Sequence, residues 1–470
     1  MLVKREAARP KERLTKSNAS SVKFLDRRAF LKQSGLVACG TAALTTTLPL
    51  TRVRKAQAAG NIGAAGEMRK VLSVCTHCSV GCTVTAEVKD GVWVGQEPSF
   101  DSPFNLGAHC AKGASVREHA HGERRLKYPT KKVGGEWKRI GWDQAIEEIG
   151  NRLSKIREES GPDSVYWLGS AKFSNEQAYL FRKFAAFWGS NNVDHQARIC
   201  HSTTVAGVAN TWGYGAMTNS YNDIHNSRAM FFIGGNPAEA HPVSLLHILK
   251  AKEQNQAPLI VCDPRFTRTA AHADEYVRLR PGTDVALVWG LLWHIFENEW
   301  EDKEFINQRV WGMDQIRSEV AKWTPDEVER VTGAPGSQLK RVAQILANNR
   351  PATVVWCMGG TQHTNGNNNT RAYCILQLAL GNMGKAGGGT NIFRGHDNVQ
   401  GATDLGVLCN TLPGYYGLSA GAWKHWARVW ETDYNYLLDR FASAEIMSAK
   451  GIPVSRWFDG VIEDPAQIEQ

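Results

Sequence analysis

Four cysteines have a spacing that suits an iron–sulfur cluster. Cys75, Cys78 and Cys82 form a C-x2-C-x3-C pattern, and Cys110 follows after 27 further residues. Each iron of a cubane 4Fe–4S cluster needs one thiolate, and three thiolates on one loop with a distant fourth satisfy that need. A structural zinc site usually pairs its ligands in two C-x2-C knuckles, and two disulfides are the remaining alternative. The spacing favours the cluster.

A second group that could do chemistry is the adjacent pair Cys200 and His201, in the segment ARICHSTTVAG. A cysteine next to a histidine could be a reactive pair. A packed thiol beside a hydrogen-bonded histidine is the commoner explanation for such a pair taken alone. The pair by itself therefore leaves both interpretations open.

The N-terminal region has the pattern of an export signal. Residues 1–58 hold 13 Lys and Arg but only 3 Asp and Glu, so the net charge of +9 belongs to this region and the remainder is close to neutral. Arg27 and Arg28 precede a short apolar run, and Ala56-Gln57-Ala58 matches a small-x-small cleavage site. We expect residues 1–58 to be a twin-arginine signal peptide that directs a folded protein to the periplasm. An amphipathic helix or a membrane anchor is the alternative, although the apolar run is shorter than the roughly 20 residues that span a bilayer.

The elements that must position these groups follow from the hydrophobic pattern. Four short apolar runs, each ending in a turn-forming cluster, alternate with helical stretches, and this alternation predicts an α/β fold with a doubly wound, mostly parallel sheet. The runs are residues 165–171, 229–237, 258–265 and 353–360, and helices are expected over 142–159, 284–300 and 336–348. The first of these helices has Ile146, Ile149, Leu153 and Ile156 at helical spacing.

Chain length and composition set the expected domain organisation. A chain of 470 residues is longer than a single hydrophobic core normally supports, so two or more subdomains are expected. Its apolar fraction of 42% and charged fraction of 21% are ordinary for a globular protein. We expect an iron–sulfur module over residues 59–130, with a hairpin turned at Asp90-Gly91, and α/β subdomains with the site over 131–410. Residues 411–470 are expected to be irregular and to contact a missing second half.

The motifs together resemble a known family. The leader, VCTHCSVGC, AHCAKG and ARICHSTTVAG are similar to the catalytic subunits of molybdenum- or tungsten-dependent formate dehydrogenases of the bis-pterin (DMSO reductase) superfamily. The resemblance continues through FIGGNPAEAHP, VCDPRFTRTA, RLRPGTD, MGGTQHTNGNNNTRA and NIFRGHDNVQGATDLG, from about residue 70 to 410. The ordered set is far more specific than any single motif.

The resemblance implies roles for four residues. It implies that Cys200 ligates molybdenum or tungsten, that His201 positions or accepts a proton, and that Arg371 grips the formate carboxylate. Lys112 matches a lysine that lies between the cluster and one pterin. Without the resemblance, Arg371 would be interpreted as a helix-surface arginine and Lys112 as a solvated lysine.

The strand ends offer contacts for a pterin guanine dinucleotide, of which the resemblance implies two. Glycines permit close backbone approach to a pyrophosphate, polar side chains can bond ribose or base edges, and arginines can meet phosphate. The candidates are Gly234, Gly235, Asn236, Asp263, Arg265, Arg268, Gly282, Asp284 and Gly359. An N-capping role for Thr283 or Asp284 explains that position equally well. The G-x-G-x-x-G pattern of nicotinamide-binding proteins is absent from the sequence.

The implied activity is oxidation of formate to carbon dioxide. Electrons would leave through the cluster to an iron–sulfur partner subunit or a membrane cytochrome subunit, and no nucleic-acid partner is expected. Catalytic subunits of this family are typically much longer, so we expect either a second polypeptide that completes the subunit or a fragment. The rivals are a periplasmic nitrate reductase, which the histidine after Cys200 disfavours, a non-catalytic iron–sulfur electron-transfer subunit and a disulfide-stabilised binding protein.

Overall fold

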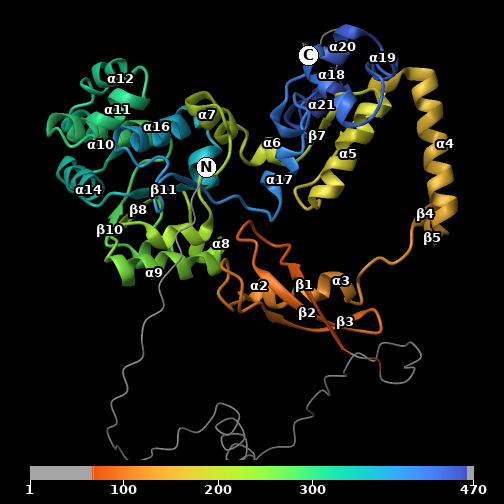
Figure 1. Cartoon of the computed structure of the whole chain (residues 1–470), viewed down its shortest axis with the longest axis horizontal. Helices are drawn as coiled ribbons and strands as arrows, with labels where there is room; N and C mark the ends of the chain where they lie inside the picture. The colour runs from red at the N-terminus through yellow and green to blue at the C-terminus, as the bar shows by residue number, and fades with distance from the viewer. Residues whose placement is uncertain (1–65, 67, 463–470) are drawn as a thin grey trace, which may run out of the picture. The chain divides into compact units, whose positions relative to one another are not determined.

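The computed structural model describes residue 66 and residues 68–462, which belong to one compact unit (Figure 1). The predicted signal peptide, residues 1–58, lies outside the described residues and stays a prediction. Among the residues that are described, no helix has both the length and the hydropathy needed to cross a bilayer.

The cysteine-bearing module begins with a three-stranded antiparallel sheet. Strand β1 (Arg69–Val74) pairs with β2 (Thr83–Lys89), which pairs with β3 (Val92–Pro98). The β2–β3 turn has Asp90 and Gly91 at φ values of 51° and 75°, the left-handed conformation that two-residue hairpin turns need. The predicted hairpin is therefore confirmed. Two short helices complete the module, α2 (Ala111–Ala114) and α3 (Val116–His121).

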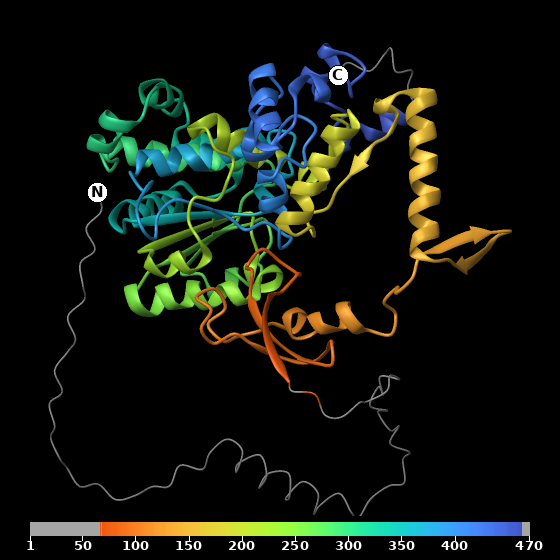
Figure 2. The ribbon, with the colours of Figure 1, turned by 45° about the vertical axis from the view of Figure 1, so that its right-hand side comes forward.

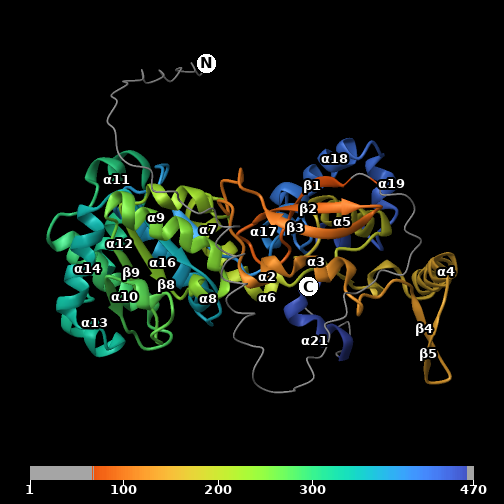
Figure 3. The same ribbon diagram turned by 90° about the horizontal axis from the view of Figure 1, so that it is seen from below.

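A second hairpin leads into the long helix α4 (Trp142–Ser160), as Figure 3 shows. The hairpin consists of β4 (Thr130–Val133) and β5 (Glu136–Arg139). The helix forms where the pattern predicts it, but its apolar stripe is largely uncovered. Ile146 and Ile149 are 66% and 60% exposed, and Ala145 is the residue of α4 that is buried.

A small parallel sheet precedes the Cys200 segment. Strand β6 (Trp167–Leu168) pairs with β7 (Val193–Asp194), and α5 (Asn175–Trp188) connects them behind a capping box made by Ser174 and Gln177. Two consecutive helices follow β7, α6 (Ala197–Cys200) and α7 (Ser202–Trp212). Cys200 thus ends one helix and His201 stands between the two.

A five-stranded parallel sheet forms the largest core, with the strand order β10-β9-β8-β11-β12. The three predicted apolar runs from residue 229 onward are confirmed as β8, β9 and β11. The strands are β8 (Ala229–Ile233), β9 (Leu259–Cys262), β10 (Glu275–Val277), β11 (Ala352–Trp356) and β12 (Thr390–Ile392). The helices between them include α8 (Pro237–Ala240), α9 (Leu245–Asn255), α10 (Asp284–Glu297), α14 (Gly336–Asn348) and α16 (Gly366–Ala379). The predicted α/β class is confirmed.

Both faces of this sheet are covered, which explains its unbroken apolar strands. In β8, Phe231 packs with α10, α14 and α16 in one core cluster, whereas Phe232 packs with α9 in another. The second cluster also contains Cys75, Cys78 and Cys82. Figure 2 shows α9 on one side of the sheet and the helices of the first cluster on the other. The cysteine loop therefore shares a core with one face of the sheet.

The C-terminal segment differs from the expectation of an irregular region. From residue 411 it contains α18 (Ala420–Val429), α19 (Tyr434–Leu438), α20 (Ala444–Ser448) and α21 (Trp457–Ile462). Trp423 is fully buried in a cluster with Ala186 of α5, and its indole N–H donates to the Met447 carbonyl at 2.9 Å. The helices are short and joined by tight turns, so the sequence shows no long periodicity, but aromatic side chains hold them on α5.

Candidate active site

The C-x2-C-x3-C pattern lies in the loop between two paired strands. Cys75 follows β1 directly and Cys82 precedes β2, and the Cys75 N–H donates to the Cys82 carbonyl at 2.9 Å. Cys110 is the residue that precedes α2. All four thiols are free, and Cys110 packs against the core cluster that contains the other three. Strand pairing thus gathers the sequence-predicted ligand set.

The electrostatics of the four thiols fit a cluster. Burial, and then the neighbouring thiols Cys78, Cys75 and Cys110, raise the pKa of Cys82 to about 12. Thiols held in this way become thiolates when positive iron supplies compensating charge. Within the described part of the chain, no three Cys, His, Asp or Glu side chains lie close enough to share one metal ion. A cubane cluster binds each thiolate at its own iron, so it does not require the four thiols to share one metal ion.

The Cys200 site lies near the point where the strand order of the large sheet reverses. Strand β8 is flanked by β9 on one side and by β11 on the other, so the switch point lies between β8 and β11. Ligands of parallel sheets bind at such points. A cavity of about 370 Å³ is lined there by Cys200, Thr361, His363 and neighbouring residues. The sheet topology therefore places Cys200 at a binding crevice.

Cys200 is held in a partly positive environment. Its thiol is buried, and burial raises its pKa, while the Gly395 backbone N–H and the Arg394 guanidinium lower it. The counteracting groups both favour the thiolate form. This is the environment expected of a thiolate that ligates a metal.

His201 is fully buried and neutral. Burial, followed by repulsion from Arg394 and His241, lowers its pKa to about 3. The Thr361 hydroxyl donates to the Cys357 carbonyl at 3.0 Å, so at 3.4 Å from His201 Nδ1 the same oxygen acts as an acceptor. The proton of this imidazole is then on Nδ1. Nε2, which has no partner within the described residues, is left as a proton acceptor.

Arg394 is the residue that sequence reasoning missed. It follows β12, its side chain is 1% exposed, and its Nη2 donates to the Gly215 carbonyl at 2.9 Å. Its Nε and Nη1 have no partner within the described residues. A buried guanidinium with free donors beside a thiol is a site for an anion. The sequence motif NIFRGHDNVQG contains Arg394, but only the packing around the sheet shows that the arginine is buried.

Arg371 does not line the cavity that contains Cys200. It lies on α16, its side chain is exposed, and it lines a different pocket together with Gly282, Thr283 and Trp289. The helix that starts after β11 places Arg371 in a different pocket, whereas the loop after β12 brings the buried Arg394 close enough to Cys200 to lower the pKa of its thiol. The structure thus offers Arg394 as the cation at this site.

Lys112 connects the cysteine module to the large sheet. Its ammonium donates to the Ala240 carbonyl at 2.9 Å, at the end of α8. Lys112 also lowers the pKa of Cys78, which burial raises. The lysine therefore lies between a predicted cluster ligand and the end of α8, and its place between the cluster and a pterin stays a prediction.

The glycines at the strand ends serve a close approach between two loops. Gly234 has a φ of 68°, and a Cβ there would overlap the backbone of Gly359 and Gly360. The Gly359 N–H donates to the Gly234 carbonyl at 3.0 Å. Gly235 is buried next to Cys357. These glycines let the loops after β8 and β11 meet at the switch point.

The polar residues predicted to contact the dinucleotide at the other strand ends already form hydrogen bonds or ion pairs with residues of this chain. Asn236 Oδ1 accepts from the Thr269 hydroxyl at 2.7 Å, and Asp263 Oδ1 accepts from the Arg265 N–H at 2.9 Å. Arg265 and Arg268 are exposed and share Glu239 as an ion-pair partner, at 3.8 and 3.7 Å. Exposed pairs of this length are weak, so both arginines remain free to meet a phosphate.

The segment before α10 does not use a side-chain cap. The Thr283 hydroxyl donates to the Arg280 carbonyl at 2.7 Å, and buried Asp284 accepts from the Tyr373 hydroxyl at 2.8 Å. Gly282 has a φ of 83° with open space beside its Cα. The capping alternative is therefore not what the structure shows, and Gly282 retains room for a ligand.

Comparison with family models agrees with this geometry. Residues 68–122 match the molybdopterin oxidoreductase Fe4S4 domain, and residues 125–445 match the molybdopterin oxidoreductase domain. The chain belongs to the molybdopterin oxidoreductase family. A pterin-bound metal and a 4Fe–4S cluster fit the residues present, because Arg394, whose charge acts on the Cys200 thiol, has unpartnered buried donors and because four free thiols gather in the module.

Curated members of the family extend the comparison. The chain is 38% identical over 367 residues to the F420-dependent formate dehydrogenase 1 subunit alpha of Methanococcus maripaludis, covering 78% of this chain and 54% of that protein. It is 35% identical over 429 residues to the major subunit of the nitrate-inducible formate dehydrogenase of Escherichia coli, covering 74% and 42%. This molybdopterin oxidoreductase spans about half the length of the curated relatives it matches.

A solved structure supports the fold. Acetylene hydratase from Pelobacter acetylenicus superposes with a TM-score of 0.61 at 30% identity, covering 67% of this chain and 44% of that one. The predicted fold and family are confirmed, and the individual site residues stay predictions.

Proposed function

We propose that this molybdopterin oxidoreductase oxidises formate to carbon dioxide at a molybdenum or tungsten centre carried by two pterin guanine dinucleotides. The observation that carries the proposal is Arg394, a fully buried guanidinium beside Cys200 with free donors. Its free Nε and Nη1 donors can bind a small carboxylate. Relatives named as formate dehydrogenases, at 35–38% identity, support formate as that carboxylate.

The chain contributes binding, orientation and proton acceptance. Formate loses one proton and two electrons to become carbon dioxide, and the bound metal–pterin group would supply the two-electron redox chemistry. Cys200 would hold the metal. Arg394 would bind and orient the carboxylate, and the neutral His201 would accept the proton at Nε2.

The electron path follows the contacts of Lys112. Its ammonium bridges from the cluster module to the end of α8, which follows the Gly234–Asn236 loop. We propose that electrons pass from the pterin by Lys112 to the 4Fe–4S cluster and on to a partner subunit. A positive charge on this path stabilises the reduced cluster.

Three measurements on the native complex that contains this chain test the function. Formate should reduce an artificial dye, nitrate should not oxidise a reduced dye, and metal analysis should give about four irons with one molybdenum or tungsten. Nitrate turnover without formate turnover would establish the nitrate reductase alternative. Iron without molybdenum or tungsten would establish a non-catalytic electron-transfer subunit.

Export and partners complete the proposal. We propose that residues 1–58 direct folded export to the periplasm, that a second polypeptide completes the catalytic subunit, and that an iron–sulfur or cytochrome subunit takes the electrons. Replacing Arg27 and Arg28 by Lys should leave the protein in the cytoplasm of the native host, as fractionation would show. Co-purification of the untagged complex should recover the partner subunits.

A further inference from the structure

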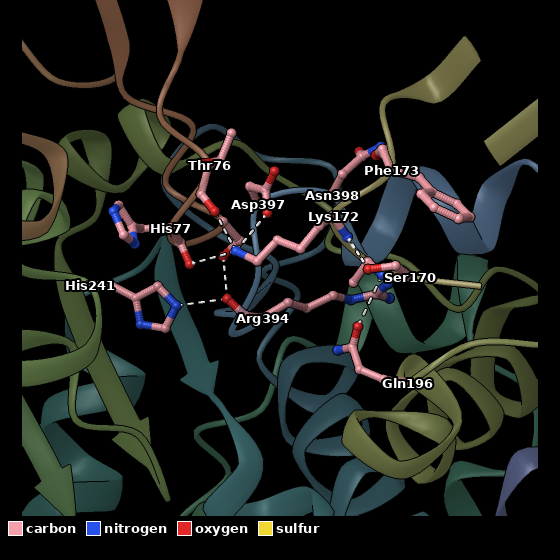
Figure 4. Close-up of polar contacts among 12 residues, drawn as sticks. Thr76, His77, Ser170, Lys172, Phe173, Gln196, His241, Arg394, Asp397 and Asn398 are labelled. Carbon is pink, nitrogen blue, oxygen red and sulfur yellow. Dashed lines mark hydrogen bonds and ion pairs between the residues drawn. The ribbon is translucent and has the colours of Figure 1, made fainter. Parts of the chain in front are cut away.

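Lys172 reaches the cluster loop from a distant part of the chain. It lies in the loop after β6, and its ammonium donates to the carbonyl oxygens of Thr76 and His77, the latter at 3.3 Å. Thr76 and His77 stand between the cluster ligands Cys75 and Cys78. Figure 4 shows the lysine side chain extended toward these carbonyls. A second cation, besides Lys112, therefore lies at the loop that carries three of the four thiols.

Asp397 holds this cation in place. Its Oδ1 lies 3.0 Å from Lys172 Nζ, and its side chain is 13% exposed, against 42% for the lysine (Figure 4). The neighbouring Asn398 donates from its backbone to the Ala171 carbonyl at 3.2 Å and from its side chain to the Phe173 carbonyl at 2.8 Å. The backbones on both sides of the ion pair are thus joined, which fixes the two charges relative to each other.

The same segment carries Arg394. The Arg394 carbonyl accepts from the Ser79 hydroxyl on the cluster loop and from His241 Nε2, the latter at 2.7 Å. The cluster loop and the segment that presents Arg394 to Cys200 therefore share two sets of contacts, through Ser79 and through the ion pair.

The two charges have opposite signs and both lie at the loop that carries the cluster thiols. Lys172 donates to the backbone carbonyls of Thr76 and His77, between Cys75 and Cys78. The Asp397 carboxylate lies against the same ammonium, at 3.0 Å. An electron added to a cluster is stabilised by a nearby cation and destabilised by a nearby anion, and the effect is stronger where the surroundings exclude water. The pair therefore lies where it can set the redox behaviour of the cluster.

We propose that Lys172 is a positioning residue whose charge raises the reduction potential of the 4Fe–4S cluster, and that Asp397 anchors this charge over the cluster loop and opposes it. The inference requires the cluster but not formate as the substrate. A chain that proves inactive with formate would still test it.

Redox titration of the full chain, followed by EPR of the reduced cluster, provides the test. Lys172→Met should lower the ratio of reduced to oxidised cluster at a fixed potential by about threefold to tenfold, roughly 30 to 59 mV for a one-electron couple. Asp397→Asn should shift the potential in the opposite direction, because it removes a negative charge while Lys172 keeps its contacts with the carbonyls of Thr76 and His77. Lys172→Gln, which can still donate to the carbonyls, should behave like Lys172→Met, whereas Lys172→Arg should restore the parent potential.

A matched lysine elsewhere in the fold is the control. Lys252 on α9 also donates to a carbonyl, that of His272 at 2.8 Å, and also pairs with an aspartate, Asp274 at 2.8 Å. Lys252→Met should leave the cluster potential unchanged.

Three outcomes would overturn the proposal. They are no shift in the Lys172 variants, shifts of the same sign for Lys172→Met and Asp397→Asn, or a parent-like potential in Lys172→Gln. Loss of iron from both neutral Lys172 variants would also overturn it, because the ammonium would then hold the loop together rather than tune its cluster.

Discussion

The cluster loop and the Cys200 site assemble their groups in opposite ways. One short loop between paired strands contains Cys75, Cys78 and Cys82, and a backbone hydrogen bond from the Cys75 N–H to the Cys82 carbonyl closes this loop. Cys200 meets Thr361 and Arg394 only because three segments far apart in sequence converge at the end of a parallel sheet. The geometry of a local site depends on the spacing of its residues within one loop. The geometry of a convergent site depends on the packing that orients the strands of the sheet.

The largest expected effect is loss of the cluster from a change within the local site. Cys78→Ser should abolish the iron signal, because one iron loses its thiolate and the closed loop offers no substitute. Iron analysis and the visible absorption of the cluster would measure this. Cys374→Ala, at a fully buried cysteine of α16, should keep its iron. A Cys78→Ser chain with a full complement of iron would contradict the assignment of the ligand set.

Formate turnover at the convergent site should be reduced by substitution of Arg394 but not by substitution of Arg371. Arg394→Lys keeps the charge but loses the planar fork, so formate turnover should fall by about 10²- to 10³-fold. Arg371→Lys, on the exposed face of α16, should stay close to the parent chain. Steady-state kinetics with formate would compare the two. Equal losses in both variants would remove the distinction between them.

The approach of the loops at the switch point can be tested through stability. Gly234→Ala combines a left-handed φ with overlap on Gly359 and Gly360, so it should cost about 2–4 kcal/mol of unfolding free energy. Gly282→Ala has a similar φ but open space, and should cost only about 1–2 kcal/mol. Urea unfolding would give both values. A smaller loss for Gly234→Ala than for Gly282→Ala would show that the loops do not need to meet.

The smallest effect concerns pH, and it belongs to the convergent site. Burial first, and then nearby cations, lower the pKa of His195 to about 3; burial, together with Lys112, lowers that of His241 to about 4. Below pH 6.5 the unfolded chain binds protons that the folded chain does not, so stability is full above pH 6.5 and falls as the pH drops toward 4. The slope should be at most about 1.4 kcal/mol per pH unit for each histidine.

Melting temperatures between pH 7 and pH 5 would show this slope, and His195→Gln should flatten it. An unchanged slope in that variant would mean that His195 already carries its proton in the folded chain.

Much of the fold could be predicted because local patterns determine it. The apolar runs became β8, β9 and β11, the hairpin turned at Asp90-Gly91, and the helix over 142–159 formed. The helices after residue 411 were missed because each is too short to show a period, and their stability comes from packing around Trp423. The exposure of Ile146 and Ile149 could not be predicted either, because helical spacing predicts an apolar face but not which segment packs against that face.

The sequence by itself predicted the cluster ligands, the Cys200–His201 pair and the glycines at the strand ends, because each belongs to a pattern of neighbours in the chain. Only the tertiary structure distinguished Arg394 from Arg371. Both arginines follow strands of the same sheet, but Arg371 is exposed on α16, whereas Arg394 is buried in the loop after β12. It also brought Lys172 to the cluster loop. Burial and long-range contacts decide which charges are desolvated, and neither can be predicted from the spacing of residues along the chain.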